Sequence, residues 1–184
     1  MKLLSLFALF CSLSTALLAM PSQVILIRHA EKPDIGNGLS KAGFQRAAAF
    51  VPFFTLNPES NLFNSPAVIF SQGTSHNHQS TRPCQTVGPL ANALGVDLIS
   101  EFSQQKYDDM VKEIKSNSTY NGKTVLICWS HQCLGDIAAS FGVSPKPTYP
   151  DGIFDRLWII DFSGNDVTAF QDLPQQLMYG DTEN

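Results

Sequence analysis

The sequence predicts an α/β fold with three layers: a mostly parallel central sheet, helices on both of its faces, and a C-terminal β-hairpin. Short apolar runs rich in β-branched residues alternate along the chain with longer segments whose apolar residues recur at helical spacing. The short runs are apolar at every position, which is typical of strands covered on both faces. The chain has 184 residues, 43% of them hydrophobic, which is enough for a substantial core.

The N-terminal residues 1–20 predict a secretory signal peptide. A single Lys2 precedes a run without charges that extends to Ala19, and this run is short for a membrane span. Small residues place the cleavage site between residues 16 and 20, and a strand-like segment follows instead of a basic stop-transfer cluster. We therefore expect a single domain over 21–184, a secreted or periplasmic location, and no membrane span after cleavage.

The first predicted strand covers residues 24–27, and the turn-rich segment 33–38 separates it from a helix that Ser40 can cap. The apolar residues that recur at helical spacing in this helix, and that we expect to face the core, are Phe44, Ala47, Ala48, Val51 and Phe54. A second strand is predicted at 67–70, and the polar segment 71–80 after it is expected to contain no helix or strand.

The second half of the chain repeats the alternation. Pro83 favours the start of a helix, and Gly95 is placed to end it. Residues 124–129 predict a third buried strand, and the apolar stripe behind it predicts a helix that ends at Gly142. Two strand-like runs joined by a polar turn within 156–170 predict the C-terminal hairpin.

Three cysteines remain after removal of the leader: Cys84, Cys128 and Cys133. Because three is an odd number, at least one thiol stays free or pairs between chains. A bridge between Cys128 and Cys133 would cross a strand-to-helix junction, and the sequence leaves it open. None of the three is followed six positions later by an arginine, which excludes a Cys-dependent phosphatase.

The charge balance limits the classes of ligand. The chain has 12 Lys and Arg residues and a formal net charge of −4. We therefore expect no broad basic surface that would bind nucleic acid or an anionic membrane. Any anion must be bound by a local cluster of cations.

Such a cluster is predicted at the ends of two buried strands. His29 follows the first strand and His131 follows the third, and ligands of open α/β sheets bind beyond the carboxyl ends of the strands. Arg28 is adjacent to His29, and Arg82 stands at a helix start where free N–H groups favour an anion. Guanidinium groups match phosphate oxygens, so a tetrahedral dianion is the expected guest. The alternative is structural, with Arg28 in an ion pair with Glu31 or an Asp and Arg82 as a solvated helix cap.

Four motifs occur in a fixed order along the chain. They are Arg28-His29-Ala30-Glu31, Leu39-Ser40-Lys41-Ala42-Gly43-Phe44-Gln45-Arg46-Ala47, Arg82-Pro83-Cys84-Gln85-Thr86 and Ser130-His131. In this order they resemble the histidine phosphatase superfamily, which comprises the phosphoglycerate mutase-like and acid phosphatase-like enzymes. The stretch 154–158 also resembles a small secreted bacterial subgroup of that superfamily.

The resemblance implies a phosphoglycerate mutase-like catalytic domain over 21–184 that hydrolyses a phosphomonoester or a related phosphoryl compound. His29 would be the nucleophile that becomes phosphohistidine, and Arg28, Arg82 and His131 would bind the phosphate. A small molecule or a phosphoprotein would be the substrate. A neutral imidazole is a good nucleophile near pH 7, and fixed cations stabilise the transferring group, so no metal or cofactor is expected.

The sequence departs from the superfamily pattern in its general acid. Gln132 follows His131 where many members have a carboxylate. Glu101 and Asp108 are the remaining candidates, although both fit surface or capping positions better, since Asp108 stands at a predicted helix start. Without an acid, substrates with good leaving groups would be preferred, because general acid catalysis typically contributes about 10²- to 10⁴-fold.

Three alternatives stay open at this stage. A module that binds phosphate groups without turnover would carry the same cations, and its discriminating position is 29. Mutase activity would need a second phosphate pocket, for which no further Arg or Lys cluster is present. His76 and His78 could bind zinc together with His29 or His131, or they could belong to a polar loop at the mouth of the site.

The walls of the site are expected from three segments, 33–38, 71–80 and 102–109. Two aromatic residues in the last segment, Phe102 and Tyr107, could stack on an aryl substrate, but packing against the sheet is the better interpretation.

Overall fold

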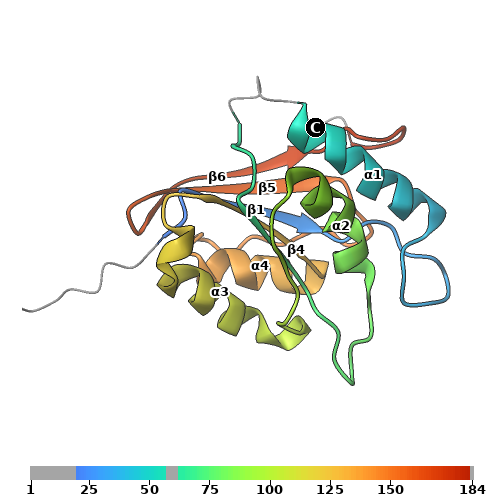
Figure 1. Ribbon diagram of the computed structural model, residues 1–184, viewed down its shortest axis with the longest axis horizontal. Coiled ribbons are helices and arrows are strands. Elements are labelled where there is room, and N and C mark those ends of the chain that lie inside the picture. The colour runs from blue at the N-terminus through green and yellow to red at the C-terminus, as the bar shows by residue number, and fades with distance from the viewer. Residues whose placement is uncertain (1–19, 57–61, 183–184) are drawn as a thin grey trace, which may run out of the picture.

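Six strands, four α-helices and two short 3-10 helices alternate along residues 20–56 and 62–182, which are the part of the chain that the computed structural model describes (Figure 1). The strands are β1 (Gln23–Arg28), β2 (Val68–Ser71), β3 (Leu98–Ile99), β4 (Thr124–Trp129), β5 (Arg156–Ser163) and β6 (Asp166–Pro174). The helices are α1 (Lys41–Thr55), α2 (Arg82–Leu94), η1 (Gln104–Lys106), α3 (Tyr107–Ser116), η2 (Ser118–Tyr120) and α4 (His131–Ser140). The expected signal peptide lies outside the described residues up to position 19.

The strands form one mixed sheet in the order β3-β2-β4-β1-β5-β6. Parallel pairs join β3 to β2, β2 to β4 and β4 to β1, whereas β5 runs antiparallel to β1 and forms the C-terminal hairpin with β6. β1 and β4 are therefore neighbours, in the register Arg28 opposite Trp129. This order confirms the expected α/β fold with a mostly parallel sheet and a terminal hairpin.

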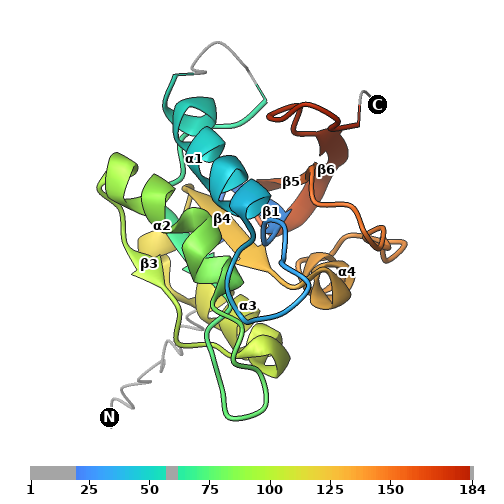
Figure 2. The ribbon, with the colours of Figure 1, turned by 90° about the vertical axis from the view of Figure 1, so that its right-hand side faces the viewer.

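Helices cover both faces of the sheet, α1 and α2 on one side and α3 and α4 on the other (Figure 2). Side chains alternate along β1, so that Ile25 and Ile27 pack under α1 and α2 while Val24 and Leu26 pack under α3 and α4. Every residue of β1 and β4 is buried, as the continuous apolar runs predicted. The central strands thus belong to both cores, and this packing fixes the position of the strand ends.

The predicted buried face of α1 is wrong in part. Ala47 and Phe54 face the core as expected, but Phe44 is 52% exposed and Ala48 is also exposed. The residues that the helix buries are Gly43, Arg46, Ala47, Phe50 and Phe54. The buried face of α1 is therefore rotated relative to the predicted one, because Arg46 is buried in ion pairs with Glu31 and Asp181. Apolar spacing does not reveal such pairs between distant segments.

The second half of the chain follows its predictions closely. Gly95 ends α2 in the left-handed conformation, and Gly142, with φ of +108°, follows the end of α4. The short edge strand β3 was not predicted, and only the start of α3 was indicated. Phe102 and Tyr107 pack against the core on the α3 and α4 side, which confirms the packing interpretation.

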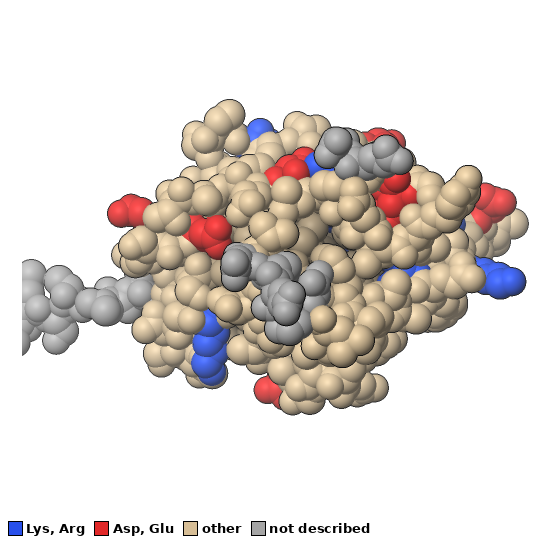
Figure 3. Space-filling model, turned by 90° about the horizontal axis from the view of Figure 1, so that it is seen from above, with Lys and Arg blue, Asp and Glu red and all other residues tan. Residues whose placement is uncertain are grey.

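The cysteines, the surface charges and the helix lengths each test an expectation from the sequence. Cys84, Cys128 and Cys133 are free, so the Cys128–Cys133 bridge is not formed. On the face drawn in Figure 3, the charged side chains are scattered among uncharged residues and form no continuous basic patch. No helix within the described residues is long and apolar enough to cross a membrane.

Candidate active site

The ends of β1 and β4 bring two histidines to the same edge of the sheet. His29 directly follows β1, and its backbone N–H donates to the carbonyl of Trp129 at 3.0 Å, which extends the pairing of the two strands by one residue. His131 is the first residue of α4, and a single residue, Ser130, separates it from the end of β4. The adjacency of these residues therefore follows from the parallel register of two central strands.

Arg82 reaches the same place from α2, which starts after the end of β2. The Arg82 side chain is held by two backbone carbonyls of the segment 33–38: Nε donates to Gly38 at 3.0 Å, and Nη2 donates to Gly36. Thr86, one turn later, accepts the backbone N–H of Ala30 at 2.9 Å. These contacts fix the start of α2 to the loop that carries His29.

A cavity of about 200 Å³ lies between these elements, and all four predicted residues line it. Its lining consists of Arg28, His29, Lys32, Gln72, His78, Ser80, Arg82, Gln104, Ser130, His131 and Gln132. Of the expected wall segments, 71–80 and 102–109 contribute side chains, whereas 33–38 acts through its contacts with Arg82. The cavity combines two arginines and a lysine with no carboxylate side chain among these lining residues.

His29 is held as a neutral base. Its Nδ1 is 2.8 Å from the carbonyl oxygen of Ala30, and because a carbonyl only accepts, Nδ1 carries the hydrogen and Nε2 keeps a free lone pair. The residue is 6% exposed. Burial, opposed by the Ala30 hydrogen bond and assisted by the charges of Arg28 and Arg82, lowers the pKa of His29 to about 4. The imidazole is therefore unprotonated at neutral pH.

Arg28 is buried between the sheet and the segment before β5. Its Nη1 donates to the carbonyl of Ile153 at 2.8 Å, and its guanidinium carbon lies 3.9 Å from the centre of the Phe154 ring. Burial lowers the pKa of Arg28, although the group stays a cation. Nε is buried and has no partner, so the guanidinium keeps a donor that the protein does not satisfy. Glu31 does not pair with Arg28, in contrast to the structural alternative, because it contacts Arg46.

His131 is supported by a residue that sequence reasoning missed. Nε2 lies 3.4 Å from the carboxylate of Asp151, which is exposed in a turn where Gly152 has φ of +77°. Nδ1 is buried without a partner. Burial lowers the pKa of His131, with the charge of Arg28 acting in the same direction and that of Asp151 against it. Nothing in the sequence around Asp151 links it to His131, which is twenty positions earlier.

Amide and hydroxyl groups complete the wall on the β4 side. Gln72 accepts the backbone N–H of Ser130 at 3.2 Å, and Gln104 donates from Nε2 to the Ser130 hydroxyl at 3.2 Å and to Gln132 at 3.1 Å. These side chains leave the wall polar but uncharged. The loops that carry them were predicted, but the individual glutamines were not.

Neither candidate for the general acid lines the cavity. Asp108 is in the first turn of α3, where it accepts a hydrogen bond from the Ser140 hydroxyl at 3.1 Å, and Glu101 is exposed. The histidines considered for zinc also separate: His78 lines the cavity and contacts Gln105, whereas His76 is exposed beside Asn77. The described residues contain no group of three or more His, Cys, Asp or Glu side chains arranged to hold a metal ion.

Comparison with solved structures identifies the fold. No family model and no curated protein sequence matches the chain. Among solved structures, the protein histidine phosphatase SixA complexed with tungstate is 12% identical, with 83% of this chain and 97% of that chain covered and a TM-score of 0.57. The mycobacterial glucosyl-3-phosphoglycerate phosphatase is 10% identical, with 83% and 97% covered and a TM-score of 0.52. The chain therefore has the α/β fold of these phosphatases, as the phosphoglycerate mutase-like expectation stated.

Proposed function

We propose that the protein is a phosphatase that hydrolyses phosphoryl compounds through a phosphohistidine at His29. One observation carries the proposal: a buried imidazole with a free Nε2 lone pair shares a cavity with Arg28, Arg82 and His131, and none of the described residues that line this cavity has a carboxylate side chain. A tetrahedral dianion fits this charge pattern, and a neutral imidazole at its edge is a nucleophile at pH 7.

The reaction proceeds in two displacements. In the first, the lone pair of His29 Nε2 forms a bond to phosphorus, while the bond from phosphorus to the leaving group breaks and its electron pair stays on the leaving group. In the second, a water oxygen attacks phosphorus and the N–P bond breaks, which returns the lone pair to Nε2. The proton lost by water balances the proton gained by the leaving group, so the net products are inorganic phosphate and the protonated leaving group.

Arg28, Arg82 and His131 are the binding groups in this proposal. Their donors would neutralise the equatorial oxygens of the transferring group, which is most of the catalysis that phosphoryl transfer requires. The tungstate bound by the SixA structure is a tetrahedral oxyanion, which supports an oxyanion site in this fold.

The preferred substrates have good leaving groups. Among the described residues, no carboxylic acid lines the cavity to protonate a leaving oxygen, and Asp151, which contacts His131, is exposed to solvent. Aryl phosphates and anhydrides, either as small molecules or on phosphoproteins, expel their leaving groups as stable anions without such help, and phosphoramidates do so once their nitrogen has taken a proton from solvent. We expect alkyl phosphates to react more slowly by about 10²- to 10⁴-fold, the usual contribution of a general acid.

The test uses a chain of residues 21–184 with an aryl phosphate, an alkyl phosphate and a phosphoramidate as substrates. His29→Gln should reduce turnover by at least about 10³-fold, the order of loss when a nucleophile is removed. His76→Gln is the matched control, since His76 is exposed and does not line the cavity. The wild-type protein, quenched in alkali because phosphohistidine is labile in acid, should carry a phosphoryl group that His29→Gln lacks.

Two results would contradict the proposal. Phosphate binding to the wild-type chain without release of inorganic phosphate from any substrate would indicate a binding module instead. Equal activity of His29→Gln and wild type would show that position 29 is not the nucleophile. An alkyl phosphate turned over as fast as an aryl phosphate, with chemistry limiting both, would overturn the substrate preference alone.

A further inference from the structure

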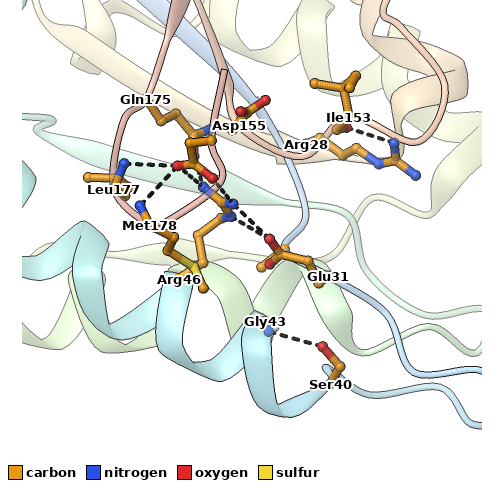
Figure 4. A network of polar contacts seen from close by, with 12 residues as sticks. Arg28, Glu31, Ser40, Gly43, Arg46, Ile153, Asp155, Gln175, Leu177 and Met178 are labelled. Carbon is orange, nitrogen blue, oxygen red and sulfur yellow. Dashed lines mark hydrogen bonds and ion pairs between the residues drawn. The ribbon is translucent and has the colours of Figure 1, made fainter. Parts of the chain in front are cut away.

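The side chain of Glu31, two residues after His29, does not line the catalytic cavity. It turns to Arg46 of α1, whose Nε and Nη2 donate to one Glu31 carboxylate oxygen at 2.9 and 2.7 Å (Figure 4). Arg46 is 3% exposed, so its charge must be compensated within the protein. The loop that carries the nucleophile is thus bound to a buried cation in the first helix.

The other side of Arg46 is occupied by the C-terminal segment, residues 175–182. Asp181 accepts from Nη2 at 2.6 Å and from Nη1 at 2.9 Å, and Gln175 accepts from Nη1 at 3.1 Å. The same Asp181 carboxylate also accepts the backbone N–H groups of Leu177 and Met178, at 2.9 and 3.1 Å. The segment is therefore folded around one carboxylate that points at Arg46.

A second connection joins the C-terminal segment to the residues that hold Arg28. The backbone N–H and the hydroxyl of Thr182 both donate to the buried carboxylate of Asp155, and Gln175 N–H donates to the Asp155 carbonyl at 2.7 Å. Asp155 follows Ile153 and Phe154. The carbonyl of Ile153 accepts from the guanidinium of Arg28 (Figure 4), and the Phe154 ring packs against the same group. The segment is therefore linked to both sides of the Arg28-His29 pair, through Arg46 to Glu31 and through Asp155 to the residues that contact Arg28.

We infer that the C-terminal segment is part of the phosphate-binding machinery, with Arg46, Asp155 and Asp181 as positioning residues for Arg28 and His29. This inference rests on the proposed function. The segment holds the loop after β1 at a fixed distance from Ile153 and Phe154, and an error of about 1 Å at a catalytic group can cost about 10²-fold in rate. Buried ion pairs are seldom more stabilising than apolar residues of the same shape. Orientation of the site therefore explains this buried ion pair better than stabilisation of the fold does.

The test compares Asp181→Asn with Asp172→Asn in the chain of residues 21–184. Asp172 pairs with Arg156 at 2.7 Å in the adjoining hairpin and contacts neither side of the site, so it controls for loss of an arginine–carboxylate pair. Asp181→Asn should lower kcat with an aryl phosphate by about 10- to 100-fold and weaken the binding of inorganic phosphate, at a temperature where the variant is folded. Asp172→Asn should leave both at the wild-type level.

A variant with a smaller change protects the test against misfolding. Thr182→Val removes only the hydroxyl bond to Asp155 and should reduce kcat and phosphate affinity in the same direction by a smaller factor. NMR titration of the His29 imidazole adds a readout that needs neither turnover nor phosphate. In Asp181→Asn the His29 pKa should move upward from its wild-type value, because a loosened loop gives the ring more access to water.

The outcomes separate this inference from the proposed function. If Asp181→Asn is less stable but, while folded, keeps wild-type kcat, phosphate affinity and His29 titration, the segment is only structural and the inference is wrong. If the wild-type chain has no turnover and binds no phosphate, the proposed function fails. In that case an unchanged His29 titration in Asp181→Asn overturns the positioning role, and a shifted titration supports it.

Discussion

The imidazole of His29 is kept unprotonated by its surroundings. The ring is buried, its Nδ1–H donates to the Ala30 carbonyl, and two arginines lie in the same cavity. Each feature except the hydrogen bond favours the neutral form, and the hydrogen bond selects the tautomer that leaves Nε2 free. The nucleophile of the proposed reaction is therefore preformed in the free protein.

Stability should depend on pH through His29. Its pKa of about 4 in the folded protein lies below the ordinary value of 6.5, so between these values the unfolded chain binds a proton that the folded chain does not. As pH falls from 7 to 4, this residue should reduce the free energy of unfolding by up to about 3 kcal/mol. The loss is complete near the folded pKa, and lower pH adds nothing further from this group.

The measurement is urea unfolding of the wild type and of His29→Gln at several values between pH 4 and 7, in buffers without phosphate. The difference in unfolding free energy between the two proteins should change with pH in this window, the wild type losing relative stability as pH falls. Parallel pH profiles would show that His29 titrates normally in the folded protein.

Residue roles at this site were predicted unevenly. The adjacency of Arg28 and His29 is local, and Arg82 stands at a helix start, so the sequence pointed to all three. Asp151 and Phe154 reach the site from a segment more than a hundred positions after β1. No local pattern marks such contacts, because they depend on how the chain returns to the sheet.

At the scale of elements, α1 shows how the site constrains packing. Gly43 is in the first turn of α1, after the cap in which Ser40 accepts its N–H at 3.1 Å. A Cβ at this position would lie 2.4 Å from the backbone carbonyl oxygen of Glu31. The loop after His29 thus rests directly on the helix, and only glycine allows that approach.

Gly43→Ala should destabilise the protein by about 1–3 kcal/mol, the usual cost of overpacking, and should lower activity because the loop must move. Gly88→Ala in α2 is the matched control. Apart from its chain neighbours, a Cβ there would meet nothing within 4 Å, so alanine at position 88 should destabilise the protein less than Gly43→Ala does. Urea midpoints at unchanged m-values test both effects. Equal midpoints for the two variants would contradict the close contact.

At the scale of the whole molecule, two cores on opposite faces of one sheet hold the site at the sheet edge. The C-terminal segment returns to Arg46 and Asp155, so that contacts from this end of the described chain reach residues beside the site. Secretion is a proposal at this scale, because the apolar leader precedes the described residues. It accounts for the apolar run in residues 1–19, which lie outside the described residues.

The full chain of 184 residues, expressed in a secreting bacterial host, should be exported with a new N-terminus after a cut between residues 16 and 20. Intact mass of the exported protein measures the cut. A variant with Leu6→Arg and Leu9→Arg should stay in the cell uncut, since charges interrupt the apolar run. Retention of Met1 on the wild-type protein would contradict the signal-peptide proposal.

The sequence by itself determined the alternation of strands and helices, the fold class and the four residues that now line one cavity. These follow from local patterns: continuous apolar runs, helix caps, and polar residues placed directly after buried strands. Only the tertiary structure decided which face α1 buries, the contacts of Asp151 and Phe154, and the pairing of Glu31 with Arg46. The reason is physical, since each of these depends on pairing between charges or rings far apart in the chain, and such pairing leaves no periodic trace in the sequence.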